Sequence, residues 1–138
     1  MVFSGAAPSS VKFNIYTDHH KLSLYTNITQ KCLENTIDVP VLPLDSMVKT
    51  HRFPAPYLVK IDVEGAGLEV LKGATETLTQ TKAVVIEAFV GKSFNRTPDF
   101  GDLIIFMKER GFSVFDILAG SNRDNKLFQV DLVFITAH

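Results

Sequence analysis

The chain has 138 residues and a formal net charge of −1, and 46% of its residues are apolar. This composition is that of a globular protein, and we expect one domain over residues 1–138. Without a basic stripe, the sequence argues against a nucleic-acid partner, and without an apolar run of spanning length it argues against a membrane partner. A single cysteine, Cys32, fits a reducing compartment, so we expect a cytoplasmic protein.

The first third of the chain predicts mainly extended structure. Val11–Ile15 alternates apolar and polar residues, which is typical of a half-buried strand, and Leu22–Tyr25 fits a second short strand. The polar stretch Asn27–Asp38 fits a loop or a frayed helix. Two prolines make Val39–Leu44 extended and restrict it to the edge of a sheet. A short helix follows, with Asp45 as its expected N-cap.

The centre of the chain predicts a strand, a helix and a second strand. Tyr57–Val63 and Ala83–Val90 are short apolar runs typical of buried strands, and Leu68–Leu78 has helical spacing. Side chains alternate across a strand, so Lys60, Asp62 and Glu64 share one side of the first strand. We expect Lys60 to pair with a neighbouring carboxylate, such as Glu87 on the second strand.

The last third predicts a helix and two strands. Thr97 and Pro98 signal the start of a helix, the apolar spacing continues to Met107, and Gly111 fits the residue just past its end. Strands are expected at Phe112–Leu118 and Leu127–Thr136, with a polar loop at Gly120–Lys126 between them.

This order of elements predicts an α/β fold. We expect a mostly parallel sheet with helices on its faces and a C-terminal antiparallel hairpin. Acidic residues gather near the carboxyl ends of the two central strands, where ligands bind in open α/β sheets. Asp62, Glu64 and Glu87 are therefore the candidate site residues. Each also has a structural interpretation, since Asp62 fits a helix cap and the two glutamates fit hydrogen-bonded strand ends.

The stretch Leu58–Ala66, continued by Leu68–Ala74, resembles the signature of the FkbM-type methyltransferases. The resemblance runs over nearly the whole chain and corresponds to the C-terminal part of that family's catalytic domain. It implies a Rossmann-like fold, S-adenosylmethionine as the cofactor, and methyl transfer, mostly to oxygen. It also implies that Asp62 lies beside the methionine part of the cofactor, as a cofactor-binding and catalytic residue. Where the family usually has glutamate, this chain has Gly67.

One part of a complete methyltransferase is not found in this sequence. A glycine-rich loop between a strand and a helix normally lets the backbone approach the cofactor, and the Gly65-Ala66-Gly67 run lacks the third glycine at Val70. We therefore expect a truncated or split catalytic domain. Its expected partners are a small-molecule or glycan acceptor, and either a second copy of the chain or the N-terminal half that it lacks.

Two other functions stay open at this point. Asp62, Glu64 and Glu87 are three oxygen donors that fit a divalent metal ion, as in a metal-dependent hydrolase or phosphotransferase, although nothing in the sequence cradles phosphate. The chain also fits a non-catalytic remnant that serves as an interaction domain. Binding of S-adenosylmethionine separates the first function from both others, and our prediction includes no metal.

Overall fold

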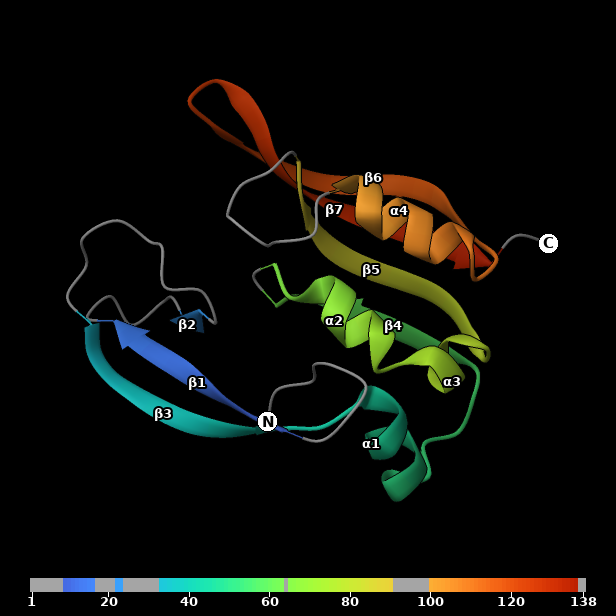
Figure 1. Ribbon diagram of the computed structural model, residues 1–138. Coiled ribbons are helices and arrows are strands. Elements are labelled where there is room, and N and C mark those ends of the chain that lie inside the picture. Colours follow the sequence, from blue (N-terminus) through green and yellow to red (C-terminus); the bar gives the residue numbers. More distant parts are fainter. Residues whose placement is uncertain (1–8, 17–21, 24–32, 64, 91–99, 137–138) are drawn as a thin grey trace.

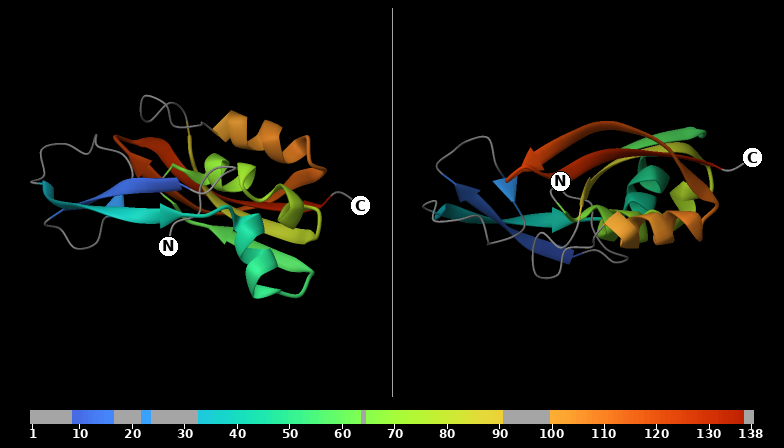
Figure 2. Two further views of the ribbon diagram at one scale, coloured as in Figure 1. Left: turned by 60° about the horizontal axis from the view of Figure 1, so that its bottom comes forward. Right: turned by 90° about the horizontal axis from the view of Figure 1, so that it is seen from above.

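The computed structural model describes residues 9–16, 22–23, 33–63, 65–90 and 100–136. The strands in this part of the chain form two sheets, one of three strands and one of four (Figure 1). The four-stranded sheet and its helices hold the buried core, and the three-stranded sheet extends to one side of them (Figures 1 and 2).

The three-stranded sheet is antiparallel. It is built from β1 (Ser9–Tyr16), β2 (Leu22–Ser23) and β3 (Leu33–Val41), in the order β2-β1-β3. The predicted strand at Val11–Ile15 is confirmed, and β3 lies at an edge, as its proline predicted. For residues 33–38 the prediction of a loop or helix was wrong. Their polar sequence has no strand pattern, and it is the pairing with β1 that fixes their extended conformation.

The four-stranded sheet is mixed. It consists of β4 (Tyr57–Ile61), β5 (Thr81–Phe89), β6 (Phe112–Arg123) and β7 (Lys126–Thr136), in the order β4-β5-β7-β6. As predicted, β4 and β5 are parallel neighbours and β7 runs antiparallel to its neighbours. The expectation of a mostly parallel sheet was wrong, because β7 inserts between β5 and β6 and makes both of its own pairings antiparallel.

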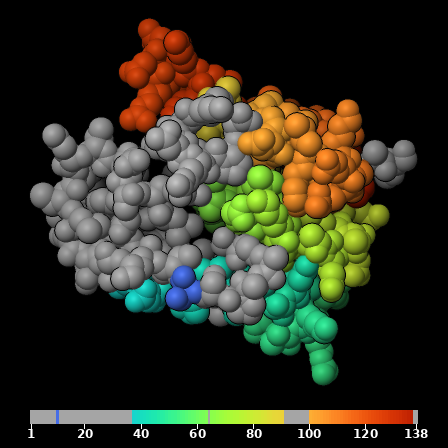
Figure 3. Space-filling model, viewed as in Figure 1, coloured from blue at the N-terminus to red at the C-terminus, as the bar shows by residue number. Residues whose placement is uncertain are grey.

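The connection between β6 and β7 is a tight turn rather than the predicted loop over Gly120–Lys126. Asp124 and Asn125 have φ values of 52° and 58°, and together they form the two-residue turn between the paired residues Arg123 and Lys126. Left-handed residues at both positions match the twist of a hairpin, and Asp and Asn tolerate this conformation. The strands therefore continue almost to the turn, and the tip of the hairpin projects from the molecular surface (Figure 3).

Four helices complete the described structure: α1 (Leu44–His51), α2 (Gly67–Lys72), α3 (Thr75–Leu78) and α4 (Phe100–Lys108). The single helix predicted over Leu68–Leu78 is in fact two, separated at Gly73 and Ala74. The last helix ends as predicted, with Gly111 at a φ of 80°. Its predicted start, Thr97 and Pro98, lies outside the described residues.

The helices cover one face of the four-stranded sheet and not both faces, as Figure 2 shows. Alternate residues of β5 and β7 point into the core between that face and the helices, and they include Ile86 and Leu132, both 0% exposed. They pack against apolar residues of α2, α3 and α4 such as Leu71, Leu78 and Met107. On β4, by contrast, the side chain of Leu58 is 72% exposed. The opposite face of the sheet has no helix over it within the described residues.

Gly67 explains how closely α2 approaches the sheet. A Cβ atom at this position would lie 2.7 Å from Cδ1 of Ile86, whose side chain is fully buried. A larger residue at this position would require the Ile86 side chain, the helix or the strand to shift. The glycine that departs from the family pattern thus permits direct helix-to-strand packing.

Candidate active site

Asp62 directly follows the last residue of β4, at the carboxyl end of a parallel strand. Its Oδ2 lies 3.4 Å from Nζ of Lys60, and the two side chains are 60% and 64% exposed. The predicted carboxylate partner of Lys60 is thus Asp62 and not Glu87, because residues two apart on a strand project to the same side. An ion pair with this exposure contributes little stability, so the Asp62 carboxylate is accessible to a ligand.

Glu87 lies near the carboxyl end of β5, the strand beside β4. Ile61 of β4 is in register with Ile86 of β5, so Asp62 and Glu87 follow this pair on two adjacent strands. The structure therefore places these two predicted site residues near the carboxyl ends of neighbouring strands. The third predicted site residue, Glu64, lies outside the described residues, as does Cys32.

Asp131 is an acidic residue that the sequence reasoning missed. It lies on β7 directly opposite Glu87, and both side chains are half-buried. The two carboxylates line one hollow of about 190 Å³. Asp131 interrupts an otherwise apolar strand between Val130 and Leu132, and this interruption was the signal available in the sequence.

A metal site is not supported by this arrangement. Within the described residues, no group of three or more His, Cys, Asp or Glu side chains is positioned to hold a metal ion. The set of three acids that motivated a hydrolase or phosphotransferase includes Glu64, which lies outside the described residues, so the structure does not test that set.

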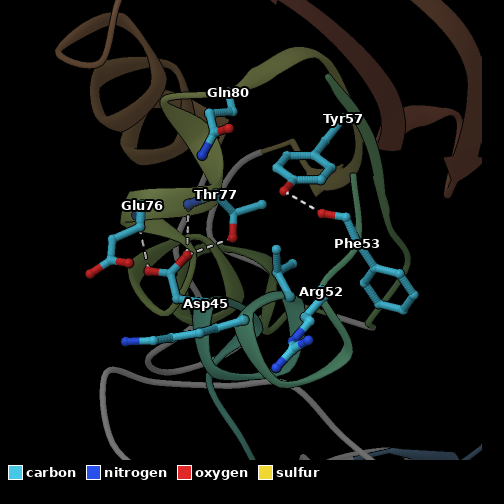
Figure 4. A pocket seen from close by; sticks show the side chains of 9 residues that line it. Asp45, Arg52, Phe53, Tyr57, Glu76, Thr77 and Gln80 are labelled. Atoms are coloured by element: carbon cyan, nitrogen blue, oxygen red, sulfur yellow. Dashed lines mark hydrogen bonds between the residues drawn. The ribbon is translucent and has the colours of Figure 1, made fainter. Parts of the chain in front are cut away.

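A larger hollow, of about 350 Å³, lies at the other end of β4 (Figure 4). Its wall includes Asp45 of α1, Thr77 of α3 and Tyr57, the first residue of β4. The Asp45 carboxylate accepts hydrogen bonds from the backbone N–H groups of Glu76 (3.0 Å) and Thr77 (2.7 Å). It also accepts hydrogen bonds from the hydroxyl groups of Thr77 (2.6 Å) and Thr75 (3.3 Å).

These contacts make Asp45 a structural residue. It was predicted to cap its own helix, but α1 has no side-chain cap, and Asp45 instead caps the N-terminus of α3, about 30 residues later in the chain. Burial alone would raise the pKa of the Asp45 carboxyl, but the hydrogen bonds from Thr77, Glu76 and Thr75 outweigh it and lower that pKa. With its oxygens held in this way, Asp45 stabilises the junction of α1 and α3 rather than binding a ligand.

The exposed Asp62 carboxylate at the carboxyl end of β4 can accept a hydrogen bond from a ligand. Ionised carboxylates only accept hydrogen bonds, and a hydroxyl group can donate one or lose its proton to such a group.

The described helices include none that is long and apolar enough to cross a membrane.

The chain is similar to known methyltransferases. Over 58 residues, 42% of its length, the chain is 38% identical to the hexuronic acid methyltransferase of Haloferax volcanii. It spans only 24% of the length of that relative. Among solved structures it is similar to magnesium protoporphyrin IX methyltransferase from Synechocystis PCC 6803, with a TM-score of 0.46 and 13% identity over 62% of this chain and 42% of the other.

Residues 5–114 match the model of the methyltransferase FkbM domain, which is most of the chain. This match includes β4, the turn that follows it, and Asp62. The chain therefore belongs to the FkbM family of methyltransferases, enzymes that use S-adenosylmethionine as the methyl donor.

Proposed function

We propose that this chain forms the acceptor side of a Rossmann-like domain that transfers a methyl group from S-adenosylmethionine to a hydroxyl oxygen. The observation that carries the proposal is the Asp62 carboxylate, exposed at the carboxyl end of β4 within the matched family segment. Glu87, near the end of the neighbouring strand, supports it as a second contact for the acceptor.

The residues present fit one side of such a cofactor site. Asp62 offers a carboxylate at the strand end, and Gly65, with a φ of 86°, turns the chain toward α2. The 138 residues include no glycine-rich loop between a strand and a helix. We therefore propose that residues outside this sequence hold the adenosine part of the cofactor, and that the domain is split or continues beyond these residues.

The chemistry divides between the cofactor and the chain. The bound cofactor supplies a methyl group whose bond to sulfur breaks as the acceptor oxygen forms its bond to carbon, which leaves S-adenosylhomocysteine. The chain has to orient the acceptor hydroxyl and take up its proton. We assign both tasks to Asp62, because its carboxylate is exposed at the strand end and can accept a hydrogen bond from the acceptor hydroxyl in the orienting step. Glu64 and Glu87 are proposed as further acceptor contacts.

The acceptor is proposed to be a small molecule or a glycan. The printed function of the relative from Haloferax volcanii, methylation of a hexuronic acid, supports a sugar-like acceptor. A cytoplasmic location and a partner that supplies the missing half complete the proposal. A non-catalytic interaction domain is the alternative that the experiment must separate.

The experiment titrates S-adenosylmethionine by calorimetry into the chain alone and into the chain reconstituted with a glycine-rich N-terminal half from a relative. We expect weak or no binding by the chain alone and binding by the pair. Micromolar binding by the chain alone would refute the division of the cofactor site. No binding by a well-folded pair would support the interaction domain instead.

Single-turnover transfer in the reconstituted pair then tests Asp62. Asp62→Asn keeps the shape of the side chain but removes its charge, so we expect transfer to fall by about 100-fold or more, as for loss of a general base. The matched control is Asp116→Asn, which removes a second exposed carboxylate, on β6. Unchanged transfer by Asp62→Asn would exclude Asp62 from the site, and equal losses in both variants would indicate a general charge effect.

A further inference from the structure

A band of polar side chains crosses the helix-free face of the four-stranded sheet. On β5, Ile86 and Ala88 point into the core, so Glu87 between them faces the other side. On β7, Val130 and Leu132 point into the core in the same way. Asp131 therefore shares the helix-free face with Glu87, its partner in register.

The band continues toward β6. Asp131 is in register with Ala119, and the next residue pair on the same face is Gln129 with Ser121. The small side chains of β6 leave room above the sheet at this place. The result is the hollow of about 190 Å³, lined by Glu87, Ala119, Gly120, Ser121, Gln129, Val130 and Asp131. The hollow is open to solvent on one side, so a sugar ring can enter it from the surface.

We propose that this hollow is the acceptor subsite and that Asp131 is a specificity-determining residue within it, which selects an uncharged, hydroxyl-rich group. This inference rests on the proposed function, because it concerns the acceptor of the same methyl transfer. The Asp131 carboxylate accepts a hydrogen bond from one hydroxyl group of the ligand. The Ser121 hydroxyl and the Gln129 amide each donate and accept, so they suit further hydroxyl groups.

The charge of the hollow gives the selectivity. Glu87 and Asp131 face each other directly across two paired strands, and like charges in this position repel. A ligand hydroxyl can donate a hydrogen bond to either carboxylate, whereas a ligand carboxylate would place a further negative charge beside them. A neutral sugar ring therefore binds here, and a hexuronate can bind only with its carboxylate turned away from the hollow.

The position of the hollow relates it to the reacting end of the domain. Glu87 follows Ile86, whose register partner is Ile61, and Asp62 comes next after Ile61. The hollow thus lies one strand away from the proposed proton acceptor. Of the residues that line the hollow, Glu87 on β5 is the one on the strand next to β4 and Asp62.

The test is an NMR titration of the ¹⁵N-labelled chain alone, which needs neither cofactor nor turnover. The probes are methyl α-glucopyranoside, its fully O-methylated derivative, glucuronate and magnesium chloride. We expect the neutral glycoside to shift the amide resonances of Ser121, Gln129 and Asp131. We expect the O-methylated sugar, which has no hydroxyl donors, to leave them unchanged, and glucuronate to bind at least tenfold more weakly than the neutral glycoside.

A matched pair of variants assigns the effect to Asp131. Asp131→Asn should weaken glycoside binding by about tenfold or more, as for loss of a hydrogen bond to a charged group. Asp116→Asn, on the same sheet face but outside the hollow, should leave it unchanged. The inference is overturned if Asp131→Asn binds as the parent does, if the O-methylated sugar binds equally well, or if only magnesium shifts these resonances. Cofactor binding by the reconstituted pair is measured separately, so failure of the proposed function and failure of this subsite give different results.

Discussion

Asp45 offers the sharpest test of how this fold is held together. Replacing it with alanine removes four hydrogen bonds that its carboxylate accepts across the junction of α1 and α3. It also leaves the backbone N–H groups of Glu76 and Thr77 without their cap. The loss of a helix cap costs about 0.5–2 kcal/mol, and a hydrogen bond to a charged group contributes about 1.5–3 kcal/mol.

The sum of these contributions must be reduced, because Asp45 is half-exposed and water replaces part of what is lost. We expect Asp45→Ala to lower the free energy of unfolding by about 2 kcal/mol. At about 3 °C per kcal/mol for a domain of this size, the melting temperature falls by about 6 °C. Urea unfolding and thermal unfolding followed by circular dichroism measure both quantities.

The matched control is Asp62→Ala, which removes the same carboxylate from an exposed site with a single 3.4 Å ion pair. An exposed pair of this kind contributes about 0–1 kcal/mol, so the control should unfold nearly as the parent does. Equal effects of the two substitutions would refute the assignment of Asp45 as the cap of α3.

The pH dependence gives a second check on Asp45. Its pKa is lowered in the folded chain, so its ionised form is favoured by folding. This contribution is fully present above about pH 5, declines as the pH falls below the ordinary value of 3.8, and is lost below the lowered pKa of the folded state. The stability difference between the parent and Asp45→Ala should therefore shrink in acid. A difference that grows as the pH falls would contradict the sign of the shift.

Two further predictions concern packing and association. Gly67→Ala should destabilise the chain by about 1 kcal/mol in urea unfolding, because the new Cβ would lie 2.7 Å from Cδ1 of buried Ile86. Adding Ile86→Val should recover part of this loss. Equal stability of Gly67→Ala and the parent would show that the side chains rearrange without cost. The exposed apolar residues Leu58 (72%) and Phe115 (67%) should make the isolated chain associate and bind a hydrophobic dye. Sedimentation velocity should show less association for the double variant Leu58→Ser, Phe115→Ser. A monomeric parent chain that binds little dye would contradict this prediction of association.

Much of the sheet was predictable because its information is local. The apolar runs around Val59 and Val84 identify two buried strands, and the helical residues between them require a crossover, which makes these strands parallel. The antiparallel insertion of β7 between β5 and β6 is a matter of topology, and no residue pattern along β7 records it.

The missed features depend on partners far away in the sequence. The helix break before Thr75 is stabilised by Asp45, which lies 30 residues earlier. In the same way, Asp131 becomes a candidate site residue only when β7 pairs with β5 and brings it opposite Glu87. Asp62 could be predicted as a candidate from the sequence because the motif and the strand end coincide in one short stretch.

The central place of β7 has a consequence for how the chain folds during synthesis. Of the strands in the four-stranded sheet, β7 is the last to leave the ribosome, yet β5 and β6 both hydrogen-bond to it. Until it emerges, the backbone groups on one edge of β5 and on one edge of β6 lack their strand partner, and apolar side chains of β5 remain exposed to water. The β6–β7 hairpin can then close within microseconds and dock onto β5, so cooperative burial of the core waits for the final segment of the sheet.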